Sequence, residues 1–222
     1  VLRKAGRAWQ VIIQRVHRSH FELWSMATVR QELDHRVAGL FRLPRYSCKC
    51  FRCSKSKNPL EFLMGDANRL YTSVSTEQVL SAAKSFRDEY ESLNADDRVS
   101  VLHTRRVKGY VGGSAHNNKT GTTFTLDELM NITRFATMCR VFTVGSVLVR
   151  QILGVPMGGH MSKIFISLLL CTMESDVFED REWLIANDFF SEALADAGIH
   201  PSEVFNGVRH VDAVLILSRL LC

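Results

Sequence analysis

The sequence predicts an α+β fold in which the sheet and the helices are segregated. Three observations lead to this prediction. Apolar residues recur at helical spacing in several stretches, and short apolar runs bounded by turn residues predict strands between them. The composition is that of a globular protein, with 46% hydrophobic and 23% charged residues over 222 positions. That length suits one large domain or two small ones, and no apolar run reaches the roughly 18 residues of a membrane-spanning helix.

The expected elements follow in order along the chain. Two of the expected helices begin with a capping box, a Ser or Thr followed three residues later by Gln or Glu; the pairs are Ser75 with Gln78 and Thr125 with Glu128. The helical stretches are 7–39, 75–93, 125–141 and about 161–179. The expected strands are 60–66, 99–113 as a strand or hairpin, 141–145 and 146–153 around a turn, and the strand pair 208–218. The polar segments 42–59 and 114–123 are expected to be loops.

Charge is distributed unevenly along the chain. Residues 1–57 contain 13 Lys and Arg but only three acids, a local charge of +10, whereas residues 58–222 contain 15 Lys and Arg against 20 acids. A basic block beside an acidic body indicates a surface that binds polyanions. A solvated basic helix surface is the alternative, since charged faces are common on helices.

The cysteine pattern favours free thiols. Six cysteines are too few for a disulfide scaffold and indicate a reducing compartment. Cys48, Cys50 and Cys53 form a C-x-C-x-x-C cluster, but a closed zinc site needs a fourth ligand, for which only His103 or His116 could be guessed. Free cysteines in a loop are therefore expected, rather than a zinc site.

Two aspartates stand at the ends of apolar strands. Asp66 follows Leu63 and Met64 closely, and Asp212 is preceded by Val211 and followed by five apolar residues. A carboxylate in such surroundings is costly unless it is paired or bound to a cation. If the strands are neighbours, the carboxylates repel each other and a divalent metal relieves the repulsion, with Mg²⁺ the natural choice among oxygen-liganded ions. Taken alone, either acid is also explained as a turn or cap residue.

Three segments together resemble, in order, motifs A, B and C of the palm of reverse transcriptases, most closely the retroelement and telomerase-like enzymes. "DANRLYTSV" from Asp66 resembles motif A, an Asp with Tyr or Phe after four intervening residues. "QILGVPMGGHMS" from Gln151 resembles motif B, Q-x-x-G-[IV]-P-[QM]-G-x-x-x-S. "RHVDAVLIL" from Arg209 resembles motif C, [YF]-x-D-D in a hydrophobic hairpin. The motifs span about 70% of the chain.

The resemblance implies the fold and activity of an RNA-directed DNA polymerase. It implies a right-hand palm at 60–222, a small antiparallel sheet backed by helices, with basic helical fingers at 1–59 and a fingers insertion at about 94–150. Its partners would be an RNA template, a DNA primer and deoxynucleoside triphosphates, without a membrane. The basic residues that could contact template or triphosphate are Arg42, Arg45, Lys49, Arg52, Lys55 and Lys57.

The resemblance also implies roles for individual residues. Asp66 and Asp212 would hold two Mg²⁺ ions for nucleotidyl transfer, with the carbonyl of Ala67 as a further ligand. Tyr71 would lie under the sugar of the incoming nucleotide, where a flat aromatic ring leaves no room for a 2′-hydroxyl. The remaining residues of the expected nucleotide pocket are Gln151, Gly154, Pro156, Met157 and Gly158.

Several positions depart from the family pattern. Ala213 stands where motif C has its second acid, His210 where it has Tyr or Phe, and Lys163 where motif B is often followed by Pro. The chain also ends soon after motif C, so the later palm elements and the thumb are expected to be absent. A decayed remnant that at most binds nucleic acid is therefore the alternative to a polymerase. A viral-type RNA polymerase is disfavoured by Tyr71, and an unrelated basic nucleic-acid-binding protein would need Asp66 and Asp212 to lie far apart.

Overall fold

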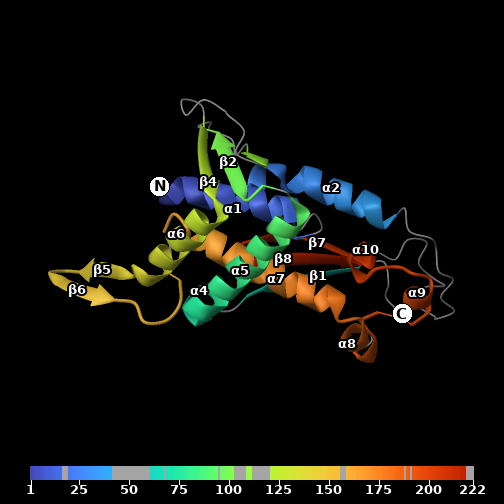
Figure 1. Cartoon of the computed structure of the whole chain (residues 1–222). Coiled ribbons are helices and arrows are strands. Elements are labelled where there is room, and N and C mark those ends of the chain that lie inside the picture. Colours follow the sequence, from blue (N-terminus) through green and yellow to red (C-terminus); the bar gives the residue numbers. More distant parts are fainter. Residues whose placement is uncertain are drawn as a thin grey trace. The chain divides into compact units, whose positions relative to one another are not determined.

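A computed structural model describes most of the chain (Figure 1). The described residues are 1–16, 20–41, 61–67, 69–94, 96–102, 109–111, 121–155, 159–187, 189–190 and 192–218. They form helices and small antiparallel sheets, which confirms the predicted α+β class. The chain divides into two compact units, the first made of residues 1–18 and 69–172 and the second of 19–68 and 173–222. The predicted functional division into fingers and palm stays a prediction.

The first unit contains helices and a small antiparallel sheet in the order β3-β2-β4. Its helices are α1 (Leu2–Val16), α4 (Leu70–Ser73), α5 (Thr76–Leu93), α6 (Leu126–Met138) and most of α7 (Ser162–Glu179). Its strands are β2 (Arg98–Leu102), β3 (Gly109–Val111), β4 (Gly121–Thr125) and the hairpin of β5 (Val141–Val144) with β6 (Val147–Arg150). The hairpin turns at Gly145, as the sequence predicts, and extends as a separate ribbon in Figure 1.

The core of the first unit is built from helix-spaced apolar residues. On α1, Trp9, Ile12 and Ile13 are fully buried, as are Phe86 and Tyr90 on α5. The indole Nε1 of Trp9 donates a hydrogen bond of 2.9 Å to the Thr133 hydroxyl on α6, which satisfies the polar edge of the ring. The periodicity that predicts these helices therefore also identifies the residues that hold them together.

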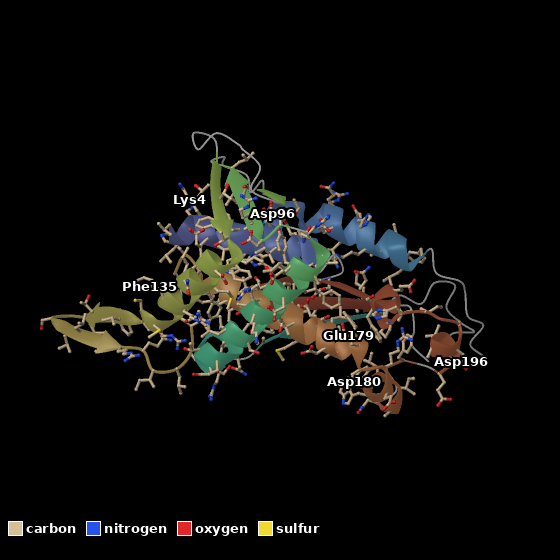
Figure 2. The ribbon with its side chains drawn as sticks, in the orientation of Figure 1. Lys4, Asp96, Phe135, Glu179, Asp180 and Asp196 are labelled. Carbon is tan, nitrogen blue, oxygen red and sulfur yellow. The ribbon has the colours of Figure 1, made fainter. Side chains whose placement is uncertain are left out.

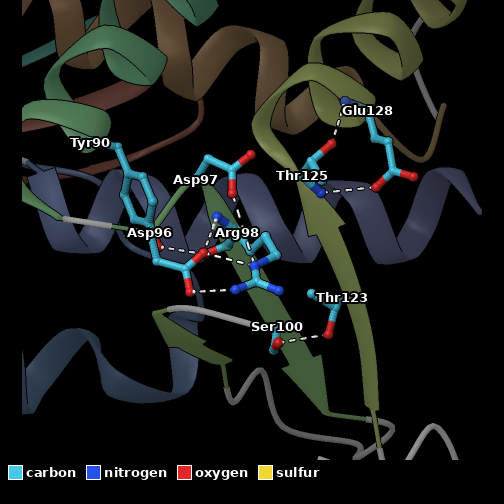
Figure 3. Close-up of polar contacts among 8 residues, drawn as sticks. All are labelled: Tyr90, Asp96, Asp97, Arg98, Ser100, Thr123, Thr125 and Glu128. Carbon is cyan, nitrogen blue, oxygen red and sulfur yellow. Dashed lines mark hydrogen bonds and ion pairs between the residues drawn. The ribbon is translucent and has the colours of Figure 1, made fainter. Parts of the chain in front are cut away.

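Both predicted capping boxes are present in this unit. At the start of α6, the Thr125 hydroxyl accepts a bond from the Glu128 amide, and the Glu128 carboxylate accepts one from the Thr125 amide (Figure 3). Ser75 and Gln78 make the same reciprocal pair at the start of α5. These bonds satisfy amides that the first helical turn leaves without partners, so they fix where each helix begins.

Polar contacts also hold the beginning of β2 in the same region. Arg98 forms an ion pair with Asp96 at 2.8 Å, and the Tyr90 hydroxyl donates to the Arg98 carbonyl (Figure 3). Across the ladder, the hydroxyls of Ser100 and Thr123 lie 2.8 Å apart. The backbone of β2 is thereby tied both to α5 and to β4.

The second unit contains an antiparallel sheet in the order β1-β8-β7. Its strands are β1 (Glu61–Asp66), β7 (Phe205–His210) and β8 (Ala213–Ser218). Its helices are η1 (Met26–Thr28), α2 (Val29–Leu40), α8 (Arg181–Ala186), α9 (Glu192–Asp196), α10 (Pro201–Val204) and the end of α7 from residue 173. A small apolar cluster joins α8, α9 and α10 through Leu184, Phe190, Leu194 and Val204. Glu179, Asp180 and Asp196 carry exposed charges on this unit (Figure 2).

The structure differs from the sequence prediction in three segments. Residues 20–25 are not helical, because the backbones of Phe21 and Leu23 hydrogen-bond to Arg209, each at 2.6 Å, and so extend beside β7. Residues 121–123 belong to β4 and not to a loop, as the β-branched threonines favour. Residues 181–204, for which the sequence pattern predicts no element, include the short helices α8, α9 and α10.

Two further observations concern whole classes of feature. None of the helices within the described ranges combines the length and the apolar character of a membrane-spanning segment. Cys139 and Cys171 are free thiols. Cys48, Cys50 and Cys53, like His103 and His116, lie outside the described residues.

Candidate functional site

The sheet of the second unit brings Asp66 and Asp212 to the same end of neighbouring strands. Asp66 is the last residue of β1 and pairs with Ala213, the first residue of β8. The Ala67 amide donates a hydrogen bond of 3.0 Å to the Asp212 carbonyl, which continues the ladder by one step. Paired Cα atoms in such a ladder are about 4.5–5.5 Å apart and successive ones 3.8 Å, so the Cα atoms of the two aspartates lie within about 9 Å. Asp66 is exposed and Asp212 half-buried.

A tight turn presents Asp212. The ladder between β7 and β8 ends with the pair His210 and Ala213, so Val211 and Asp212 form a two-residue hairpin loop. Val211 has a φ of +63°, in the left-handed region that a β-branched residue rarely adopts. Backbone strain of this kind persists only where the surroundings impose it, and it is common at functional sites.

Oxygen ligands dominate this strand end. Among the described residues, no group of three or more His, Cys, Asp or Glu side chains is arranged to hold a metal ion. At this strand end the described residues include the two carboxylates of Asp66 and Asp212, and the Ala67 carbonyl follows Asp66 in the chain. That donor set fits Mg²⁺, which usually takes one or two carboxylates and completes its shell with water and substrate phosphates.

Tyr71 and Gly154, from the segments that resemble motifs A and B, meet within the first unit. Gly154 has a φ of +82°, and a Cβ at this position would lie 2.3 Å from the Tyr71 carbonyl oxygen and 2.8 Å from the Thr72 Cα. The next amide, that of Val155, donates to the same Tyr71 carbonyl at 2.6 Å. Only glycine permits this approach of one backbone to another. The motif B loop is thus anchored to the short helix α4, which carries Tyr71.

The other motif B residues are placed in part. The side-chain amide of Gln151 donates to the Leu153 carbonyl at 2.7 Å, and its backbone amide donates to Arg140, so Gln151 holds the bend before Gly154. Pro156, Met157 and Gly158 lie outside the described residues, as do the six basic residues named between 42 and 57. Buried Ser162 begins α7, and its amide donates to the Gly159 carbonyl at 3.2 Å.

A buried charge cluster next to the Asp212 turn is absent from the sequence prediction. The Arg209 guanidinium forms ion pairs of 2.6 Å with both Glu22 and Glu174. Nearby, burial lowers the pKa of the Arg36 guanidinium, and the charges of Glu32 and Glu174 act in the opposite direction. The sequence signals for this cluster are weak: Glu22 lies between two apolar residues, and Arg209 lies in an expected apolar strand.

Comparisons with known proteins identify a fold. No protein-family profile and no curated protein matches the sequence. Solved structures of telomerase do match. The Candida albicans telomerase in complex with a fragment of telomeric RNA has a TM-score of 0.58 and 19% identity, over 98% of this chain and 30% of that one. The apo telomerase from Candida tropicalis has a TM-score of 0.60 and 14% identity, over 99% of this chain and 30% of that one.

A telomerase truncated from its C-terminal domain, also from Candida tropicalis, matches as well, with a TM-score of 0.58, 13% identity and coverage of 99% and 34% of the two chains. The chain therefore shares the fold of the matched part of these telomerase structures. It spans about a third of the length of these telomerase chains or slightly less. At such low identity, the likeness concerns the path of the backbone.

Proposed function

We propose that this chain is the fingers-and-palm portion of a reverse transcriptase, an RNA-directed DNA polymerase in which Asp66 and Asp212 bind Mg²⁺. The observation that carries the proposal is the meeting of these two aspartates at one strand end. Their position is supported by the fold, because the likeness to telomerase extends over almost the whole chain. The telomeric RNA in one of the similar structures supports an RNA template as the partner.

Each residue has a defined task in this proposal. Two Mg²⁺ ions, when bound, would supply charge stabilisation to an in-line displacement at a phosphate. The Asp66 and Asp212 carboxylates and the Ala67 carbonyl bind them. The Tyr71 ring excludes a 2′-hydroxyl and so selects deoxynucleotides. Gln151, Gly154, Pro156, Met157 and Gly158 shape the nucleotide pocket, with Gly154 keeping the loop against the Tyr71 backbone.

Metal binding by the aspartates is the first test of the proposal. Titration of the full chain with Mn²⁺, followed by electron paramagnetic resonance, is expected to detect binding that falls by at least about tenfold in Asp66→Asn and in Asp212→Asn, since each variant removes one of two anionic ligands. Asp196→Asn is the matched control, because it removes an exposed acid of α9 in the same unit. Equal Mn²⁺ binding in all these variants would contradict the metal site.

Binding of an RNA–DNA duplex is the second test. The basic block is expected to give binding that weakens by about a hundredfold or more between 50 and 200 mM salt, because each neutralised phosphate releases counterions. The double variant Arg3→Gln, Arg15→Gln removes two exposed charges of α1. Its binding constant for the duplex should depend less steeply on the salt concentration. Arg134→Gln removes an exposed charge outside the block and serves as the control. Fluorescence anisotropy measures both, and salt-independent binding refutes the role of residues 1–57.

A decayed remnant that only binds nucleic acid is the second candidate function. Ala213 favours it, because this residue pairs with Asp66 at the position where the family pattern has its second motif C acid. The two candidates differ in a measurable way. A remnant binds the duplex but shows no Mn²⁺ binding that depends on Asp66 and Asp212, whereas a polymerase shows both.

A further inference from the structure

The Arg209 side chain is buried directly beside the turn that carries Asp212. Its side chain is only 4% exposed, and Arg209 is the second-last residue of β7. Burying a guanidinium is costly unless its donors are satisfied. The bonds that satisfy them therefore indicate what the residue does.

Acceptors from at least three residues surround the guanidinium. Nη1 donates to the Glu22 carboxylate at 2.6 Å, and Nε donates to the Glu174 carboxylate at 2.6 Å. Nη1 also donates to the backbone carbonyl of Val211 at 3.3 Å. Val211 is the strained first residue of the hairpin loop, and Asp212 is the second. One side chain thus connects two distant acids to the loop itself.

The two acids are held in place by the backbone around them. Glu22 has a side chain that is 0% exposed, and it lies between two residues whose backbones bond to Arg209. Glu174, on α7, also accepts a hydrogen bond from the Phe21 amide at 3.1 Å. The guanidinium is therefore fixed from two sides.

Stability alone does not explain this arrangement. Buried ion pairs are often no more stabilising than apolar residues of the same volume. Such groups can instead specify a particular backbone arrangement. The backbone that Arg209 contacts is that of Val211, whose left-handed conformation a valine rarely adopts unless its surroundings impose it.

We infer that Arg209 is a positioning residue for Asp212, because its bond to the Val211 carbonyl fixes the hairpin loop and thereby keeps Asp212 at the strand end of Asp66. This inference deepens the proposed function and rests on it for the role of Asp212 in metal binding. Arginine suits the task because its planar group donates in several fixed directions, whereas the single ammonium of lysine cannot reproduce that fork.

The test uses Arg209→Lys in the full chain, with two measurements. The first is amide exchange of the metal-free protein by NMR, in which the Ala67 amide reports on the Asp212 carbonyl that it binds. We expect Ala67 to exchange about tenfold faster while amides in the middle of the β1–β8 ladder keep their rates, because a charge-assisted bond to the loop is lost. The second is the Mn²⁺ titration, in which the affinity should fall by about tenfold.

Two further variants separate positioning from general destabilisation. Glu174→Gln keeps the bond from Arg209 to Val211 and should leave the Ala67 rate unchanged. Leu184→Ala weakens the apolar cluster of the same unit. It should raise the exchange rates of many amides in the unit, with no larger effect at Ala67 than elsewhere. If Arg209→Lys does not fold, Arg209→Lys with Glu174→Gln leaves one lysine facing Glu22 in a one-to-one pair and is measured in its place.

The outcomes are distinct. The inference is supported if the lysine variant shows faster exchange at the Ala67 amide alone, together with weaker Mn²⁺ binding. Unchanged Ala67 exchange in the lysine variants overturns it, whatever the metal affinity. Selective exchange in a protein whose wild type binds no Mn²⁺ through Asp66 and Asp212 supports the turn-positioning role and refutes the proposed metal site instead.

Discussion

Gly154→Ala is expected to lower the free energy of unfolding of the chain by more than about 3 kcal/mol, at the upper end of the effects of single substitutions. Two costs add at this position. A residue with a Cβ loses roughly 1–2 kcal/mol in the left-handed conformation that Gly154 adopts. The new Cβ would also lie 2.3 Å from the Tyr71 carbonyl oxygen, so one of the two backbones must move. The hydrogen bond from Val155 to that carbonyl would be weakened by the same movement.

Gly145→Ala separates these two costs. Gly145 belongs to the same unit and has a φ of +62°, but a Cβ there meets nothing within 4 Å. This variant should therefore show only the conformational cost, about 1–2 kcal/mol. Urea denaturation of both variants measures the difference. Equal losses would mean that the contact between the motif B loop and Tyr71 contributes nothing.

Much of the fold could be predicted because its signals are local. Ser75 and Thr125 mark the starts of their helices through bonds that span three residues, and Gly145 marks its turn through its own backbone freedom. The extended segment around Glu22 is not predictable from local pattern, because its partner, Arg209, is 187 residues away. Helical periodicity records no such long-range pairing, and the apolar residues at 21 and 23 fit either structure.

The candidate site divides in the same way. Asp66 and Asp212 could be found because an acid at the end of an apolar strand is conspicuous in a sequence. The cluster of Arg209, Glu22 and Glu174 could not, since charged residues are usually exposed and nothing in the sequence joins these three positions. In the structure, Glu22 and Glu174 hold the Arg209 guanidinium, and Arg209 in turn donates to the backbone of the loop that carries Asp212.

Ala213→Asp should have opposite effects on stability without and with metal. Ala213 is exposed and pairs with Asp66, and residues opposite each other in a ladder project from the same face. In a chelating buffer the new carboxylate faces that of Asp66, and the repulsion should cost up to about 1 kcal/mol of unfolding free energy. With Mn²⁺ or Mg²⁺ the same charge becomes an added ligand, so metal affinity should rise by about tenfold or more.

The comparison with Ala213→Asn decides whether charge is responsible. Asparagine has nearly the same shape as aspartate without its charge, so it should neither destabilise the metal-free protein by repulsion nor gain the full metal affinity. Thermal unfolding with and without Mn²⁺ measures both effects in one experiment, because a ligand that binds only the folded state raises the melting temperature. If aspartate and asparagine behave alike under both conditions, the strand end of Asp66 and Asp212 does not bind metal. If only aspartate gains metal-dependent stability, the site retains the geometry for metal binding, and Ala213 accounts for the charge that it lacks.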